Sequence, residues 1–219
     1  MDQKVLLLKG NPAQFLNGLT SNTLDKPHNA FLNMHGRIIA TFDQICLSDE
    51  EFLIVIASKV VVALFAHVER YLKINRSTLT EIPMHVYFDL DSDAPLFPGD
   101  HTVPQKTGRL IILAQPREAS VSEDEFTRFR LENKIPLQGI DYQDEMLLNV
   151  HEFDRVSYTK GCFLGQEMVA KVHNRSKPTW ALVVRYQDEI NPKEHSKMTS
   201  LVKDLKNNRI FGFVFIPTS

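Results

Sequence analysis

The sequence contains very few cysteines: among 219 residues there are two, Cys46 and Cys162. Two cysteines cannot form the network of disulfides that stabilises small secreted domains. No Cys-x-x-Cys pair is present, and the eight histidines show no metal-ligand spacing, so we expect no metal site. Ligation of a metal cluster by this chain would need thiolates from a partner. Cys46 lies in a strand-like, apolar segment, and we expect it to be a core residue.

The sequence also lacks a long apolar run and a strong charge of one sign. No run approaches the roughly 20 apolar residues of a membrane helix. The apolar residues 5–8 are too few for the core of a secretion signal, and no small-residue cleavage site follows them. The formal net charge of −2 gives no field that attracts nucleic acid. We expect a cytoplasmic protein with no membrane contact and no direct nucleic-acid binding.

The composition that remains is typical of a globular protein, with 43% hydrophobic and 24% charged residues. The length allows one large domain or two small ones, and no internal repeat or low-complexity tract is present. The character of the chain changes near residue 176. Two strand-like segments, 180–186 and 210–216, then flank a charged stretch at 188–208. We predict a main domain over residues 1–175 and a small β module over residues 176–219.

Local patterns predict an α+β fold with mostly antiparallel sheets. Helices are expected to begin at Pro12 behind an Asn11 cap, at Ser58, and at Ser122 with Glu125 in the capping-box position, the last helix running to about residue 133. Residues 91–108 are rich in Asp, Pro and Gly and are expected to form a surface loop. The predicted strands cover residues 4–8, 30–33, 37–47, 52–56, 82–90 and 110–113.

Residues 160–167 form the most informative motif, Lys-Gly-Cys-Phe-Leu-Gly-Gln-Glu. A lysine close to a cysteine favours the thiolate, the form that attacks electrophiles and binds metal. Cys162 and Lys160 are therefore the candidate reactive residues. The other notable positions of the motif offer close backbone approach and hydrogen-bond partners, and these are Gly161, Gly165, Gln166 and Glu167.

This motif resembles the signature of the YgfZ family, folate-binding relatives of the glycine cleavage T-protein that support iron–sulfur cluster assembly or repair. Residues 15–22, 30–38 and 130–141 are similar to other family segments, in the same order. The resemblance implies a T-protein-like folate-binding domain with tetrahydrofolate as its ligand. It also implies iron–sulfur client or carrier proteins as partners, with tRNA-modifying enzymes among the clients. The stretch after Cys162 is shorter than in typical members, so we expect a truncated, barrel-like C-terminal module.

The resemblance also suggests residues for the folate site. Glu132 matches a glutamate of the family and is expected to accept the N–H groups of the pterin edge. We expect Glu132 and the 160–167 turn to line a central cavity that holds the folate, with Gly161, Gly165, Gln166 and Glu167 among the binding residues. Phe126 is a candidate for stacking on the pterin face, and Arg37 for binding the glutamate tail. Asp141 would close the pocket. Each residue has a plainer alternative: a solvated helix end for Glu132, core for Phe126, a solvated turn for Arg37 and a turn cap for Asp141.

Three functions stay open at this point. The first is a tetrahydrofolate-binding accessory factor for iron–sulfur proteins, in which Cys162 is a transient ligand for iron or a cluster. The second is a one-carbon (aminomethyl) transferase in which Cys162 is the nucleophile. The T-protein carries an acidic pair where this chain has Ala40 and Thr41, which cannot exchange a proton near neutral pH, so aminomethyltransferase activity is expected to be absent. The third is an interaction module without folate, suggested by the short C-terminus and by Lys134 where the family usually has glycine.

Overall fold

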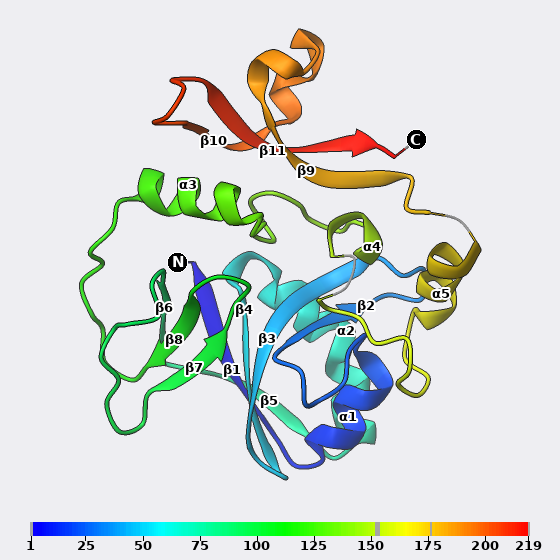
Figure 1. Ribbon diagram of the computed structural model, residues 1–219. Helices are drawn as coiled ribbons and strands as arrows, with labels where there is room; N and C mark the ends of the chain where they lie inside the picture. The colour runs from blue at the N-terminus through cyan, green and yellow to red at the C-terminus, as the bar shows by residue number, and fades with distance from the viewer. Residues whose placement is uncertain (1, 152–153, 176, 219) are drawn as a thin grey trace.

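A computed structural model describes residues 2–151, 154–175 and 177–218. The predicted α+β class is confirmed: three antiparallel sheets combine with short helices (Figure 1). No helix in these ranges is both long and apolar enough to cross a membrane. The boundary expected near residue 176 falls on a residue outside the described part, and the division into two domains stays a prediction.

The largest sheet has five strands in the order β2-β3-β4-β1-β5, and all neighbouring strands are antiparallel. Four of the five strands were predicted from the sequence, with ends that differ by a residue or two. The strands are β1 (Gln3–Lys9), β2 (His28–Leu32), β3 (Ile38–Ser48), β4 (Glu51–Ala57) and β5 (Thr78–Ile82).

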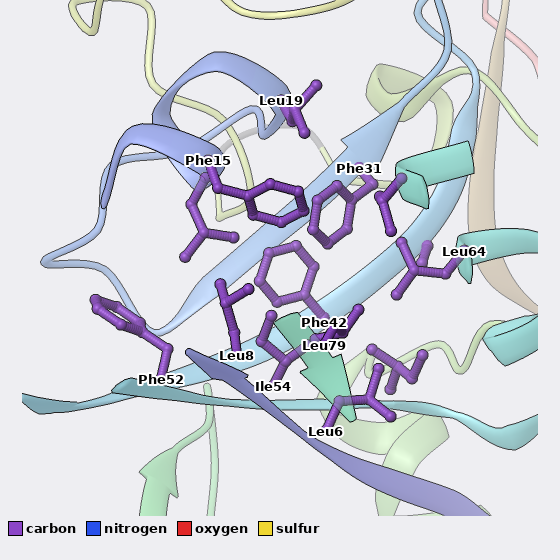
Figure 2. Close-up of a cluster of buried hydrophobic side chains, with 14 of the residues drawn as sticks. Leu6, Leu8, Phe15, Leu19, Phe31, Phe42, Phe52, Ile54, Leu64 and Leu79 are labelled. Atoms are coloured by element: carbon purple, nitrogen blue, oxygen red, sulfur yellow. The ribbon is translucent and has the colours of Figure 1, made fainter. Parts of the chain in front are cut away.

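Two helices, α1 (Pro12–Leu19) and α2 (Val61–Ile74), cover one face of this sheet. Alternation along the strands sends every second side chain to the helices, where three phenylalanines form the centre of the core (Figure 2). The Phe31 and Phe42 rings stack with their centroids 4.8 Å apart. The fully buried side chains of this core are Leu6, Leu8, Phe15, Leu16, Phe31, Ala40, Phe42, Ile54, Ile56, Val60, Leu64 and Val68.

A three-stranded sheet of order β6-β8-β7 covers the opposite face, where Val5, Leu53 and Val55 meet Val86 and Ile112. Because both faces of β1 and β4 are covered, these strands read as continuous apolar runs in the sequence. The small sheet contains β6 (His85–Asp89), β7 (His101–Pro104) and β8 (Arg109–Leu113).

The small sheet corrects two sequence-based expectations. Residues 82–90, expected as one strand, contain the last residue of β5 and the whole of β6. The two strands are separated at Pro83, which has no N–H to donate to a neighbouring strand. Residues 91–108, expected as a loop, contain β7. This strand is four residues long, too short to show a clear alternation against its Asp- and Pro-rich surroundings.

The C-terminal region forms an open sheet of order β10-β11-β9, which packs on helix α3 (Glu123–Asn133) through Leu131, Val202, Phe211 and Phe213 (Figure 1). In the described residues this sheet has three strands and does not close into a barrel. One strand lies within residues 188–208, which were expected only as a charged connection. The strands are β9 (Trp180–Tyr186), β10 (Thr199–Lys203) and β11 (Ile210–Pro217).

The helix predicted to begin at Ser58 starts with a 3-10 turn, η1 (Ser58–Val60), which leads directly into α2. Four further helical elements were not predicted from the sequence: the 3-10 helices η2 (Gln187–Glu189) and η3 (Pro192–Lys197) and the helices α4 (Leu147–Val150) and α5 (Gln166–Arg175).

One of the three predicted helix caps, Ser122, forms in the structure. Ser122 caps α3, since its Oγ accepts from the Glu125 N–H at 3.2 Å, as predicted. Asn11 does not cap α1; its side chain instead donates to the Asn75 carbonyl at 2.9 Å. Ser58 begins a 3-10 turn and makes no cap. Lys134 ends α3 in the left-handed conformation, with φ of 55°, a position that glycine occupies at lower energy.

Replacing Lys134 by glycine is expected to stabilise the protein by about 1 kcal/mol, because glycine removes the strain of a side chain at positive φ. Urea unfolding monitored by circular dichroism measures this change. The matched control is Lys171→Gly in the middle of α5, which is expected to destabilise by about 1 kcal/mol through lost helix propensity. A Lys134→Gly variant no more stable than the parent would contradict the prediction.

Candidate functional site

A cavity of about 460 Å³ lies where the five-stranded sheet, the small sheet and α3 meet. A volume of this size is within the range of small-molecule sites. The side chains around it come from segments far apart in the sequence. Those that matter below are Gln3, Thr41, Asp43, Phe88, Gln105, Phe126, Arg130, Gln138, Tyr142, Arg155 and Ser200.

Helix α3 supplies one wall of this central cavity. Glu123, Phe126, Thr127 and Arg130 all line it, and their spacing of three, four and seven residues places them on one helix face. The Phe126 ring lies 5.4 Å from the Phe88 ring, centroid to centroid, and the Arg130 guanidinium lies 5.7 Å from the Phe126 centroid. The wall therefore combines a flat aromatic surface with a cation.

A buried ion pair forms part of the opposite wall. The Asp43 carboxylate accepts from Arg155 Nη2 at 3.3 Å and contacts His28 Nδ1 at 2.6 Å. Arg155 Nη1 also donates to the carbonyls of Asn29 and Phe42. Burial by itself would raise the pKa of Asp43, but Arg155 and His28 outweigh burial and hold that pKa below its ordinary value. Asp43 and Arg155 are therefore both charged at neutral pH.

A row of hydrogen-bonded polar side chains lies beside this ion pair. Thr41 Oγ1 lies 2.7 Å from Tyr142 Oη, which lies 2.9 Å from His151 Nε2. Gln138 Oε1 accepts from the Thr41 N–H at 2.7 Å. Burial raises the pKa of Tyr142, and burial lowers the pKa of His151 against the opposing effect of Asp154. These hydrogen-bonded side chains are therefore uncharged at neutral pH. Thr41 lines the cavity as a hydroxyl, while Ala40 is buried in the core.

Four cavity-lining side chains carry buried polar atoms with no hydrogen-bond partner in the protein: Gln3 Oε1, Gln105 Nε2, Arg130 Nε and Arg155 Nε. Buried polar atoms are normally paired, and each unpaired one costs about 1–3 kcal/mol. A polar group that reached these atoms would therefore remove this cost. With the aromatic wall, they fit a flat molecule that has hydrogen-bonding edges.

Asp141 does not line the cavity but holds its wall in place. Its Oδ2 accepts from Arg130 Nη1 at 2.7 Å and from the Leu137 N–H at 2.8 Å. Its Oδ1 accepts from the hydroxyls of Thr199 and Ser200 on β10. All of these partners belong to the protein, so Asp141 is the turn cap of the two alternatives and also a clamp between α3 and the C-terminal sheet.

Glu132 was expected to bind the pterin edge, but it does not line the central cavity. Its side chain is exposed and lines a separate groove with Lys134, Tyr186 and Phe211. Each residue turns an α-helix by about 100°, so Glu132, two residues after Arg130, points to the opposite side of α3. Phe126 does lie in the cavity wall, where a stacking residue is needed.

The 160–167 motif lies apart from the central cavity, and none of its residues lines it. Cys162 is exposed. Lys160 Nζ donates to the carbonyls of Thr20 and Asn22 at 2.6 and 2.9 Å and lies 5.3 Å from the Phe163 ring centroid. Burial lowers the pKa of Lys160 to about 8. The ammonium group of Lys160 thus anchors the motif to residues 20–22.

Glycines allow this motif to contact the hairpin of residues 30–38. Gly165 has φ of 86°, and a Cβ there would lie 2.5 Å from the Asn33 carbonyl oxygen. Gly36 has φ of 74° and lies against Gly165. Gly161, in contrast, has open space around it. Two sequence segments that resemble the same family therefore meet at one surface.

The remaining predicted residues lie at or near this surface. Arg37 pairs with Asp144 at 3.6 Å and does not reach the cavity. Gln166 and Glu167 begin α5, and Gln166 borders a small cavity of about 170 Å³ with His173. In the described residues, no three His, Cys, Asp or Glu side chains gather as metal ligands.

Cys46 is exposed, which corrects its assignment to the core. The ladder between β2 and β3 ends at Asp43, so the later part of β3 pairs with β4 alone and extends beyond the packed helices. Sequence periodicity did not reveal where the cover of this strand ends.

Comparison with known proteins bears on the fold. No family model matches the chain. Its structure is similar to that of the glycine cleavage system aminomethyltransferase T from Bartonella henselae, with a TM-score of 0.69 and 14% sequence identity. The similarity covers 99% of this chain and 76% of that chain. The chain has a T-protein-like fold.

The buried Asp43–Arg155 pair is expected to make stability depend on pH. Because the folded pKa of Asp43 is below its unfolded value, the pair stabilises the protein above about pH 4 and is lost as pH falls through the folded pKa. Asp43→Asn should cost about 3 kcal/mol at pH 7, since Arg155 is left buried without its counter-ion.

Urea unfolding at pH 7, 5 and 3.5 measures this effect, and the gap between parent and Asp43→Asn should narrow at the lowest pH. The control is Asp188→Asn, which breaks an exposed pair with Arg209 and is expected to change stability little. A gap that stays constant over this pH range would show that the Asp43 charge contributes nothing.

Proposed function

We propose that this protein binds tetrahydrofolate in the central cavity and acts as an accessory factor for iron–sulfur proteins. The observation that carries the folate assignment is the cavity itself, which joins the Phe88–Phe126 wall to four buried polar atoms without a hydrogen-bond partner. A pterin has a flat face that stacks on an aromatic ring and an edge that needs donors and acceptors. When bound, tetrahydrofolate would be a carrier of one-carbon chemistry, and this chain would hold and orient it.

The iron–sulfur role is supported by the 160–167 motif and its resemblance to the YgfZ signature. Cys162 is exposed on a surface away from the cavity, where a protein partner can reach it. Thiolates suit the transient binding of iron or a cluster. The proposed partners are iron–sulfur carriers and clients, tRNA-modifying enzymes among them, in the cytoplasm.

Residues 155–162 connect the cavity to the Cys162 thiol. The Arg155 side chain lines the cavity, and its carbonyl accepts from the Ser21 hydroxyl at 2.5 Å. The Ser157 N–H donates to the Ser21 carbonyl, and Lys160 binds the neighbouring carbonyls. A ligand that contacts Arg155 therefore acts on a segment that is bonded to residues 20–22 at both ends.

The alternative function is a one-carbon transferase that uses Cys162. Two observations disfavour it. The positions of the T-protein acidic pair hold Ala40, which is buried in the core, and Thr41, whose hydroxyl is bonded within the wall. Cys162 does not line the cavity, so a folate bound there does not meet the thiol.

Titration with tetrahydrofolate, followed by calorimetry, tests the folate assignment. The parent protein should bind, and Phe126→Ala should weaken binding by roughly tenfold because the stacking surface is lost. Glu132→Gln is the internal control and should leave the affinity unchanged, since Glu132 lies outside the cavity. Absence of binding by the parent would refute the proposal.

Aminomethyltransferase activity is expected to be absent. The chain has no acid at residues 40 and 41 to exchange a proton with the substrate. Formation of methylene-tetrahydrofolate from an aminomethyl donor is measured by chromatography, with an active T-protein as the positive control. Turnover at a rate comparable to that control would favour the transferase alternative.

Cys162→Ser is expected to leave the melting temperature within a few degrees of the parent, because exposed substitutions usually change stability by less than about 0.5 kcal/mol. The variant should nevertheless fail to restore the activity of iron–sulfur enzymes in cells that lack the protein. Cys46→Ser is the matched control, because the second cysteine is also exposed, and it should restore activity fully. Full restoration by Cys162→Ser would exclude a role for the thiol.

A further inference from the structure

Two of the four unpaired atoms in the cavity belong to carboxamides. Gln3 Oε1 is an acceptor and Gln105 Nε2 is a donor, and both atoms are buried without a partner. Gln3 begins β1 in the five-stranded sheet, whereas Gln105 directly follows β7 in the small sheet. The two sheets that enclose the cavity thus contribute one unpaired amide atom each.

Several other groups at the cavity are occupied, exposed or able only to donate. Arg130 Nε and Arg155 Nε lack a hydrogen-bond partner, but each can donate and cannot accept. Gln138 uses both ends of its amide on the protein, with Oε1 bound to Thr41 and Nε2 bound to the carbonyls of Ile39 and Gln143. Asp43 contacts both His28 and Arg155 through one oxygen, Oδ1. The only other carboxylates at the cavity that the structure describes, those of Asp2 and Glu123, belong to exposed residues.

We propose that Gln3 and Gln105 together recognise the lactam edge of a flat heterocycle, an N–H group next to a C=O group. The ring N–H would donate to Gln3 Oε1, and the ring carbonyl would accept from Gln105 Nε2. This inference rests on the proposed function, because in tetrahydrofolate the edge is N3–H with the 4-oxo group. Both orphan atoms are then satisfied by one ligand edge, with no carboxylate involved.

In the orientation that the structure gives both amides, the pair has a defined selectivity. In the 4-amino-4-deoxy analogue of tetrahydrofolate the carbonyl becomes an amino donor, and the neighbouring ring nitrogen becomes an acceptor. That edge places donor against donor at Gln105 and acceptor against acceptor at Gln3. A site that hydrogen-bonds its substrate rejects an analogue with the wrong pattern strongly, because buried groups are left unpaired. The parent should therefore bind the 4-oxo ligand roughly tenfold or more tightly than the 4-amino analogue.

The test is calorimetric titration of the parent, Gln105→Glu and Gln105→Met with tetrahydrofolate and with its 4-amino-4-deoxy analogue. Gln105→Glu replaces the donor by an acceptor, so the preference for the 4-oxo ligand should be lost or reversed. Gln105→Met removes the donor without adding charge. This variant should bind the 4-oxo ligand more weakly than the parent and leave the affinity for the 4-amino analogue unchanged. Gln14→Glu, an exposed change on α1 that adds the same charge, should keep the parent preference.

The outcomes separate the two proposals. If the parent does not bind tetrahydrofolate, the proposed function fails. If the parent binds but prefers the 4-amino analogue, or if both Gln105 variants keep the parent preference, folate binding stands and the lactam assignment fails. Urea unfolding of each variant checks that it is folded, and Gln105→Met decides the question if Gln105→Glu does not fold.

Discussion

The buried ion pair between Asp141 and Arg130 is the interaction on which the rest of the site depends. Arg130 and Asp141 are 3% and 0% exposed at their side chains, and a pair so deeply buried is stable only when its remaining hydrogen-bonding positions are filled. Asp141 meets this condition by joining α3, the loop at Leu137 and strand β10. The strand helps through a bulge at Ser200, which has φ of 52° and brings its hydroxyl to Asp141 and Arg130.

This clamp sets the geometry of the cavity. Arg130 is held by Asp141 and Ser200, so its Nε stays unpaired beside the aromatic wall. The ion pair of Asp43 and Arg155 restrains the opposite wall in the same way. Unpaired buried atoms persist only where such surroundings prevent their relaxation, and they concentrate here around one cavity. Contacts within the protein therefore fix the positions of these atoms before any ligand binds.

The structure also separates two features that the sequence places together. The 160–167 motif was expected to line the ligand pocket, but it packs on residues 18–22 and on the hairpin glycines, away from the cavity. An exposed thiol and an enclosed ligand site, joined by residues 155–160, suit a protein that responds to a bound ligand while meeting a partner. They suit direct reaction between thiol and ligand less well.

The sequence by itself determined the α+β class, the long strands, the Ser122 cap and the glycine-rich contact motif, because periodicity, capping and backbone conformation are local properties. It did not reveal β7 and β10, which are short and lie in polar surroundings, or the exposure of Cys46. Only tertiary packing decided that Phe126 and Arg130, not Glu132, face the cavity, since the rotation of α3 is set by Leu131 against the C-terminal sheet. Unpaired atoms such as Gln105 Nε2 follow from long-range packing for the same reason and have no signature in the sequence.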